Sequence, residues 1–326
     1  MRGNGRISMK LLASVVALAA ATVMLSGSAI AQDKKTIAFV VNGPSDFWKI
    51  MEAAVAKAQK DMPDVVLQFK YPERADAAVQ RRMMEDLVAA GVSAIAVSVV
   101  DPPTSTDVLD KIAAQIPVFT FDSDATQSKR IAYIGSSNTE LGKNAGELMK
   151  KAMAGKTGHC VGFVGLPGAD NAKERIAGYN EAVKGTGLEI TDVKGDDIDQ
   201  TRARANVDDV LVANPDANCF VGFYSYNPPR IYEALRDAGK LGQITVVGFD
   251  EDPITLGAVK EGSFAGTVVQ QPYEWGAQGA KLIADYLKGD KSGVPADGIK
   301  IIPGLTLTKD NVDQFQADFQ KKLAGG

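Results

Sequence analysis

The sequence predicts an α/β protein made of two similar domains, each of them a doubly wound parallel sheet. Short apolar strands alternate with amphipathic helices along the chain, and the pattern of the first half returns in the second. A chain of 326 residues is long enough for two cores of ordinary size. Strand–helix–strand connections are right-handed crossovers, so consecutive strands are expected to run parallel.

The first half supplies five expected strands. Residues 35–41 form a β-rich run without turn residues, and 47–60 carry apolar side chains on one helical face. The helix expected at 75–90 stops at Gly91, and 94–100 is a continuous apolar strand. The other expected elements are strands at 65–71, 117–121 and 130–134 and a helix at 105–114.

The second half repeats this order. Strands are expected at 160–164, 189–193, 219–223 and 245–249, and helices at 172–184, 203–213 and 229–237. The segments "TIAFVVNGP", "AIAVSVVDPP" and "IPVFTFDSD" parallel "CVGFVGLPG", "CFVGFYSYNPP" and "ITVVGFDED". The offsets between matched segments are nearly constant and close to one domain length, which indicates an internal repeat.

The N-terminus has the layout of a secretory signal peptide. Arg2, Arg6 and Lys10 precede an apolar run at 11–25, and small residues stand at the two cleavage-site positions of 28–31. A membrane anchor is the alternative, but the run is short for a span. We expect cleavage after Ala31 and an exported mature protein.

Composition excludes several function classes. The chain has 36 Lys and Arg against 40 Asp and Glu, a net charge of −4, so no nucleic-acid partner is expected. Two cysteines and one histidine are too few for a common zinc cluster, and we expect no metal or cofactor. Neither a G-x-G-x-x-G motif nor a phosphate loop occurs, and His159 precedes a strand, so we expect no enzyme.

Polar residues follow the apolar strands, where doubly wound sheets bind their ligands. These candidates are Asn42, Ser45, Asp101, Asp122, 167–170, 224–227 and 250–252. A carboxylate accepts hydrogen bonds from neighbouring ligand hydroxyls, and Arg or Asn completes the set of donors. Aromatic faces such as those of Phe47 and Trp48 pack against the C–H face of a sugar ring. Each such residue taken alone is also a common helix cap, turn former or core residue.

Six segments together resemble the type I periplasmic binding proteins for sugars, close to the ribose-binding group. They are "IAFVVNGPSDFWKIMEAAVAKA", "IPVFTFDSDAT", "YIGSSNTELGKNAGELM", "NAKERIAGYNEAV", "VVGFDEDPITLGAVKEG" and "AGTVVQQPYEWG". The resemblance implies a periplasmic solute-binding protein of an ABC importer that captures a monosaccharide or similar polyhydroxylated molecule. It also implies a membrane permease as partner, a chemoreceptor as a further candidate partner, and a monomer.

The ligand-binding residues expected from this resemblance and from the strand ends are Asn42, Ser45, Phe47, Trp48, Asp122, Ser123, Arg175, Asn227, Asp250 and Gln270. Ser123 stands where ribose binders typically have arginine, the loop before Phe47 is one residue shorter, and "YSYNPP" differs from the usual segment. These departures argue against assigning ribose itself. A polyol, a branched sugar, a furanose signal molecule and a nucleoside remain alternative ligands.

The resemblance also implies three crossings between the domains, near Ser136, Gln270 and Ile302, because the family returns the late "QQPYEWG" helix to the first domain. The signal peptide is then 1–31, the N-terminal domain 35–136 plus 271–302, and the C-terminal domain 137–270 plus 303–326. A repressor of the lac type shares the sensor fold, but the export segment occupies the place of its DNA-binding headpiece.

Cys160 and Cys219 are expected to form a disulfide. In the usual strand order 2-1-3-4-5 they begin neighbouring strands of the second domain at matching registers. Adjacent strands lie roughly 5 Å apart, within disulfide reach, and export permits oxidation. Two buried free thiols are the alternative.

Overall fold

The computed structural model describes Met1 and residues 34–323. The first sheet and the helices packed on it comprise β1 (Lys35–Val40), α1 (Trp48–Asp61), β2 (Val65–Lys70), α2 (Ala77–Ala89), β3 (Ala94–Val97), α3 (Pro102–Ala113), β4 (Val118–Phe121), β5 (Ala132–Gly135), α9 (Pro272–Leu287) and β11 (Ile299–Ile301). We call this set the first lobe. The signal peptide expected over 1–31 lies, apart from Met1, outside the described residues.

The second lobe contains the other sheet and its helices. It comprises α4 (Asn138–Met153), β6 (His159–Val164), α5 (Asp170–Ala182), β7 (Ile190–Gly195), α6 (Gln200–Ala213), β8 (Ala217–Gly222), α7 (Asn227–Asp237), β9 (Thr245–Phe249), α8 (Pro253–Glu261), β10 (Gly266–Val269), β12 (Leu305–Leu307) and α10 (Val312–Leu323). Several elements were not predicted from the sequence, namely helices α4, α8 and α10 and strands β10, β11 and β12. The helix that contains the "PYEWG" segment is α9, and it packs against α1 of the first lobe.

Each sheet of the described chain has six strands in a doubly wound order. The first runs β11-β5-β4-β3-β1-β2 and the second β12-β10-β9-β8-β6-β7. All pairings are parallel except that of β10 with β12. The predicted α/β class is confirmed, and so is the internal repeat, because the two sheets share one strand order.

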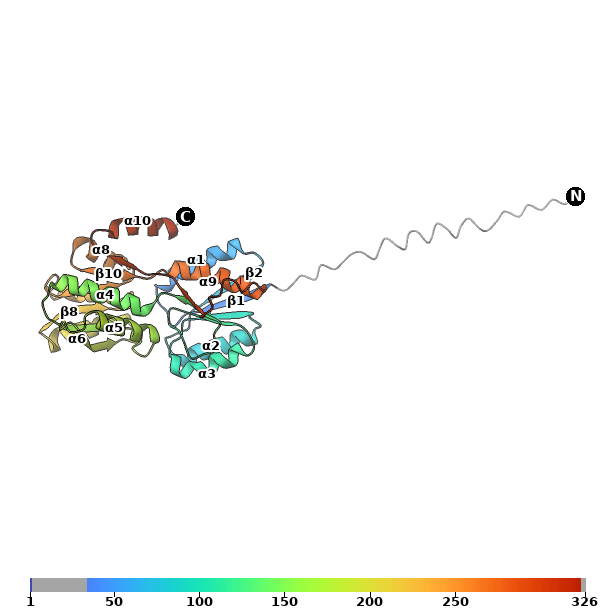
Figure 1. Cartoon of the computed structure of the whole chain (residues 1–326), viewed down its shortest axis with the longest axis horizontal. Coiled ribbons are helices and arrows are strands. Elements are labelled where there is room, and N and C mark those ends of the chain that lie inside the picture. The colour runs from blue at the N-terminus through green and yellow to red at the C-terminus, as the bar shows by residue number, and fades with distance from the viewer. Residues whose placement is uncertain (2–33, 324–326) are drawn as a thin grey trace. The chain divides into compact units, whose positions relative to one another are not determined.

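Helices cover both faces of each sheet, as alternating side chains along the strands require. In the first lobe, α1 and α9 lie side by side over one face, while α2 and α3 cover the other (Figure 1). Ile37 and Phe39 of β1 pack toward α1 and α9, while Ala38 and Val40 pack toward α2 and α3. The core of each lobe therefore has two halves, one on either face of its sheet.

Short polar side chains begin several helices. The carboxylates of Asp76, Asp199 and Asp252 and the hydroxyl of Ser137 accept hydrogen bonds from backbone N–H groups of the first turn. These caps satisfy donors that have no partner within the helix. In the described part of the chain no helix is long and apolar enough to span a bilayer.

Three segments connect the lobes, and hydrogen bonds join them to one another. Ser136 follows β5 and donates through Oγ to the Ile302 carbonyl at 2.8 Å. Gln271 follows β10 and donates through Nε2 to the Pro303 carbonyl at 2.8 Å. Ile302 and Pro303 lie between β11 of the first sheet and β12 of the second. The three connections therefore run side by side.

A disulfide joins Cys160 of β6 to Cys219 of β8, with a Cα–Cα distance of 4.5 Å. The two residues are register partners in the parallel pairing of these strands. In the first lobe the corresponding strands β1 and β3 pair Ile37 with Ala94 and have no such bond.

Candidate ligand-binding site

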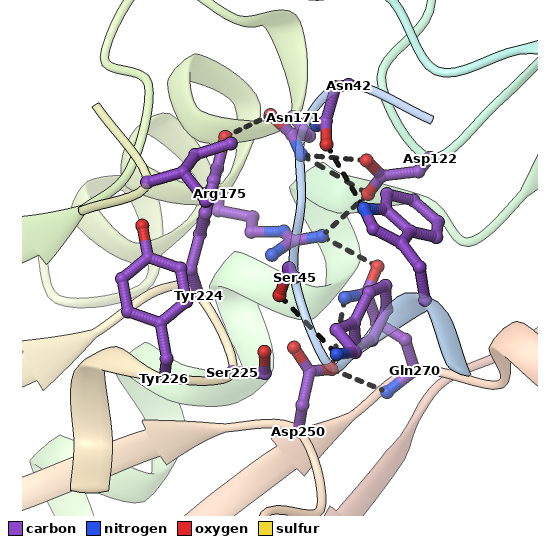
Figure 2. Close-up of a pocket in the computed structure, with 13 residues that line it drawn as sticks. Asn42, Ser45, Asp122, Asn171, Arg175, Tyr224, Ser225, Tyr226, Asp250 and Gln270 are labelled. Atoms are coloured by element: carbon purple, nitrogen blue, oxygen red, sulfur yellow. Dashed lines mark hydrogen bonds and ion pairs between the residues drawn. The ribbon is translucent and has the colours of Figure 1, made fainter. Parts of the chain in front are cut away.

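Polar and aromatic side chains from the strand ends of both lobes surround one buried cavity (Figure 2). Its lining consists of Asn42, Ser45, Phe47, Trp48, Asp122, Asn171, Arg175, Ile198, Tyr224, Ser225, Tyr226, Asp250 and Gln270. Eight of the ten residues expected from the sequence are in this set. The carboxyl ends of the parallel strands in the two sheets face each other here, as the doubly wound topology dictates.

Asp122 follows β4 and is bonded to groups of both lobes. Its carboxylate accepts from Ser98 Oγ at 2.8 Å, from Asn171 Nδ2 at 3.2 Å and from Arg175 Nη2 at 3.4 Å. Its φ of 57° is left-handed, a conformation that Asp tolerates better than most residues and that recurs at functional sites. Burial raises the pKa of the carboxyl, although the Arg175 charge and these hydrogen bonds act in the opposite direction.

Arg175 on α5 is the buried cation of the site, with 1% of the residue exposed. Its Nε donates to Asn138 Oδ1 at 3.0 Å, and its Nη1 donates to the Phe223 carbonyl at 2.7 Å. Its Nη2 donates to Gln270 Oε1 at 2.6 Å as well as to Asp122 (Figure 2). The planar guanidinium is thereby fixed by partners from several elements, which suits a group that orients a ligand.

Two glycines let α4 and α5 approach closely enough to place Arg175. A Cβ added at Gly142 would lie 2.1 Å from the Arg175 carbonyl oxygen, and one at Gly178 would lie 2.1 Å from that of Thr139. No larger residue fits without separating the helices. The close contact brings Asn138, at the start of α4, within hydrogen-bonding distance of Arg175.

Asp250 occupies in the second lobe the place that Asp122 occupies in the first. It follows β9, has a φ of 65° and is 2% exposed. Gln270 Nε2 donates to its Oδ1 at 3.0 Å, so Gln270 bridges Asp250 and Arg175. Burial raises the pKa of Asp250 to about 6, although the positive charge of Arg175 lowers it.

The loop after β1 supplies the aromatic wall. Trp48 donates through Nε1 to Asn42 Oδ1 at 3.2 Å and packs edge-on against Phe121 and Phe47. Trp48 is part of the first-lobe core and Phe47 packs against that core, yet both also line the cavity. Both aromatics therefore contribute to the first-lobe core and to the wall of the cavity.

Two expected residues do not line the cavity. Ser123 is fully buried but does not line the cavity, and its Oγ has no hydrogen-bond partner within the described residues. Asn227 opens α7, where its Oδ1 accepts from the Tyr224 N–H at 3.0 Å and its Nδ2 donates to Asp196 Oδ2 at 2.8 Å. Both polar side-chain atoms of Asn227 therefore stabilise the loop that precedes α7. This is the turn-forming role that asparagines after strands commonly have.

The strand-end candidates Asp101 and 167–170 also lie outside the lining. The lining residues absent from the expected site are Asn171, Ile198, Tyr224, Ser225 and Tyr226. One signal was present for Asn171, which stands four residues before Arg175 and therefore shares its helix face. Three of these residues, Tyr224, Ser225 and Tyr226, lie in the strand-end segment 224–227, in which the sequence predicts only Asn227 to bind the ligand. Ile198 has no such signal in the sequence.

The cavity is small as it stands. Its volume is about 30 Å³, which is room for a water molecule or two. The polar side chains fill the rest of the space by bonding to one another.

Residues 37–291 match the sequence profile of the periplasmic binding protein domain family. The chain belongs to this family. The predicted family and its two-sheet fold are therefore confirmed. Periplasmic binding proteins bind their ligands without transforming them, and this chain is a binding protein rather than an enzyme.

Relatives of this periplasmic binding protein carry sugar names. It is 30% identical over 293 residues to the ribose import binding protein RbsB of Salmonella typhimurium (strain LT2), covering 87% of this chain and 95% of that one. A solute binding protein of an ABC transporter from Burkholderia graminis, solved with D-arabinose, is 28% identical with a TM-score of 0.78, over 85% and 96% of the two chains. A carbohydrate transporter solute binding protein from Agrobacterium radiobacter, also solved with D-arabinose, is 28% identical with a TM-score of 0.80, over 88% and 98%.

Proposed function

We propose that this protein is the solute-binding component of an ABC importer and that it captures a monosaccharide or a similar polyhydroxylated molecule between its two lobes. The observation that carries the proposal is the buried cluster of Asp122, Arg175 and Asp250, drawn from both lobes beside the Trp48 indole. Ionised carboxylates accept from pairs of hydroxyls, and a guanidinium donates to hydroxyl oxygens. Ribose and D-arabinose, named for the relatives, present such hydroxyls.

The ligand enters by opening the cleft. A space of about 30 Å³ is too small for a monosaccharide, so ligand hydroxyls have to replace bonds such as that of Arg175 with Gln270. The movable units are the expected domains, 35–136 plus 271–302 and 137–270 plus 303–326. Closure then joins two half-sites on the ligand, a hinge transition in which the ligand stabilises the closed state.

The mature protein acts in the periplasm after removal of residues 1–31 and works as a monomer. The closed surface is the form that the membrane permease recognises, and a chemoreceptor is a second candidate reader of the same surface. All ten site residues expected from the sequence belong to the proposal in one of two roles. Asn42, Ser45, Phe47, Trp48, Asp122, Arg175, Asp250 and Gln270 contact the ligand, while Ser123 and Asn227 support the loops that carry Asp122 and Tyr224.

A thermal-shift screen of the mature protein tests the ligand class. A ligand at 100 times its Kd stabilises the folded state by about 2.7 kcal/mol, so a cognate sugar or polyol raises Tm measurably. Pentoses, hexoses, polyols, furanose compounds and nucleosides are screened at equal concentration, and calorimetry gives the affinity of each hit. A shift with nucleosides alone would favour the non-sugar alternative in the same fold, and no shift with any sugar or polyol would refute the proposal.

A further inference from the structure

A second cavity, the outer pocket, opens from the ligand site toward α8 and α10. Both cavities are lined by Ser45, Phe47, Ser225, Tyr226 and Asp250, so they are adjacent along one wall. The outer pocket is defined further by Asp46, Ile50, Arg230, Glu251, Asp252 and Phe319. By the same measure as the inner cavity it offers about 370 Å³, which is room for a substituent beyond the sugar ring.

Glu251 is the unusual residue of the outer pocket. It is 5% exposed, and neither of its carboxylate oxygens has a hydrogen-bond partner among the described residues. Leaving a charged group buried and unpaired is costly, so such groups are rare without a role. Burial, and then the negative charge of Asp250, raise the pKa of Glu251 well above its usual range.

The cations near the cleft are engaged elsewhere. Arg230 pairs through Nη2 with Glu233 Oε1 at 2.9 Å, and Arg175 is held by its inner-site partners. Lys49 is largely exposed and pairs with Asp46 at 2.7 Å. The carboxylates lining the outer pocket thus outnumber its single arginine, and Glu251 is the one without a partner.

We propose that the ligand carries an amino group and that Glu251 pairs with this group in the outer pocket. The substrate class is then an amino sugar or an amino-substituted polyol, with its hydroxyls on Asp122, Arg175 and Asp250 and its ammonium on Glu251. An ammonium supplies both the charge and the hydrogen-bond donors that the Glu251 oxygens lack. This inference rests on the proposed sugar-binding function and narrows it.

Matched ligand pairs test the inference by calorimetry on the mature protein. The pairs are D-glucosamine with D-glucose, D-galactosamine with D-galactose, and 1-amino-1-deoxy-D-glucitol with D-glucitol, together with the neutral sugars of the first screen. We expect an amino compound to bind at least tenfold more tightly than its neutral partner, about 1.4 kcal/mol. In Glu251→Gln the preference should fall to nearly one, because the amide keeps the shape of the side chain and loses its charge.

A matched control removes a carboxylate outside both cavities. Glu85→Gln changes an exposed residue of α2 whose nearest cation, Arg81, is 4.0 Å away, and the amine preference should persist in this variant. Glu251→Gln should melt no lower than the wild type, since it removes an uncompensated buried carboxyl, and Glu251→Asp should keep part of the preference.

The outcomes separate the two proposals. Neutral sugars that bind as tightly as their amino partners, or a preference unchanged in Glu251→Gln, would overturn the amine inference and leave the sugar-binding function intact. Failure of every sugar and polyol, amino or neutral, to bind the wild type would overturn both.

Discussion

Asp122 and Asp250 occupy equivalent positions in the two lobes and differ in what their carboxylates bind. Each follows a buried strand that ends in phenylalanine, β4 in the first lobe and β9 in the second, and each has a positive φ. Asp122 accepts from Asn171 and Arg175, which belong to the opposite lobe. Asp250 accepts from Gln270, which follows the neighbouring strand of its own sheet.

One internal repeat thus supplies two aspartates whose carboxylates differ in their hydrogen-bond donors, which include groups across the cleft for Asp122 and lie in the same lobe for Asp250. The bonds that Asp122 accepts from Asn171 and Arg175 cross the cleft and have to break when the lobes separate. Its bond from Ser98 and the bond of Asp250 with Gln270 each lie within one lobe and survive opening. Asp122 is therefore expected to contribute to closure as well as to ligand binding, and Asp250 mainly to ligand binding. The predictions below test this division and the further asymmetry that the second lobe alone has a disulfide.

Substituting Arg175 should have the largest effect on stability and affinity, because its guanidinium is bonded to site residues of both lobes. Arg175→Met removes the cation that pairs with Asp122 and leaves Gln270 Oε1 and the Phe223 carbonyl without their donor. We expect the free energy of unfolding to fall by about 3–5 kcal/mol and affinity to fall by about a hundredfold or more. Urea denaturation and calorimetry measure these, with Arg236→Met, an exposed arginine of α7, as the control. A variant as stable as the control would show that the buried cluster does not join the lobes.

Removing the disulfide should have the next largest effect on stability, and this effect should be confined to the second lobe, which contains both cysteines. It closes a loop with a sequence separation of 59 residues, which in the chain-entropy model is worth about 4 kcal/mol. Cys160→Ala with Cys219→Ala should therefore lower the free energy of unfolding by about that amount in urea. The wild type under reducing conditions should approach the variant. Two reactive thiols in the unfolded, non-reduced wild type would contradict the bond.

Single amide variants separate the tasks of the two aspartates. Asn tolerates a positive φ, so Asp122→Asn and Asp250→Asn change the charge and spare the backbone. Both should weaken ligand binding by tenfold or more, about 1.4 kcal/mol. Asp122→Asn alone should also destabilise the ligand-free protein, by about 1–3 kcal/mol, because it loses the ion pair with Arg175. Equal stability of the two variants would erase the distinction, and unchanged affinity in both would refute the cleft site.

The pH dependence should be the smallest effect and has opposite signs for stability and binding. The folded pKa of Asp250 is about 6, above its unfolded value of about 3.8, so the folded state binds a proton more readily. Between pH 7 and pH 5 this group should therefore stabilise the ligand-free fold by about 1 kcal/mol. Ligand affinity should fall over the same range, because the protonated carboxyl no longer accepts from two hydroxyls.

Asp196 has a folded pKa of about 6 as well and contributes to stability with the same sign. Asp250→Asn isolates the Asp250 contribution, since the variant retains Asp196. A wild type and an Asp250→Asn variant with identical pH profiles for affinity would show that Asp250 does not titrate at the ligand.

Much of the site could be predicted because it lies at strand ends that local patterns reveal. Asp122 and Asp250 close apolar runs in both halves, and the repeat makes them counterparts. The neighbouring Ser123 is fully buried and does not line the cavity, because a position just after a strand does not by itself fix the direction of the side chain. Asn227 failed because its amide satisfies its own turn and Asp196.

The sequence by itself predicted the alternation of strands and helices, the family and the two strand-end aspartates, and it favoured a bond between Cys160 and Cys219 over two free thiols. These predictions rest on short-range patterns, on the resemblance of six segments to a family and on one known strand order. Tertiary structure decided which polar atoms meet. The hydrogen bonds of Arg175 depend on the close packing of α4 on α5. The Glu251 carboxylate lacks a hydrogen-bond partner because none of the described residues that fold around it places a donor within reach. Such contacts join residues far apart in the chain, and their geometry is set by side-chain packing that no local pattern encodes.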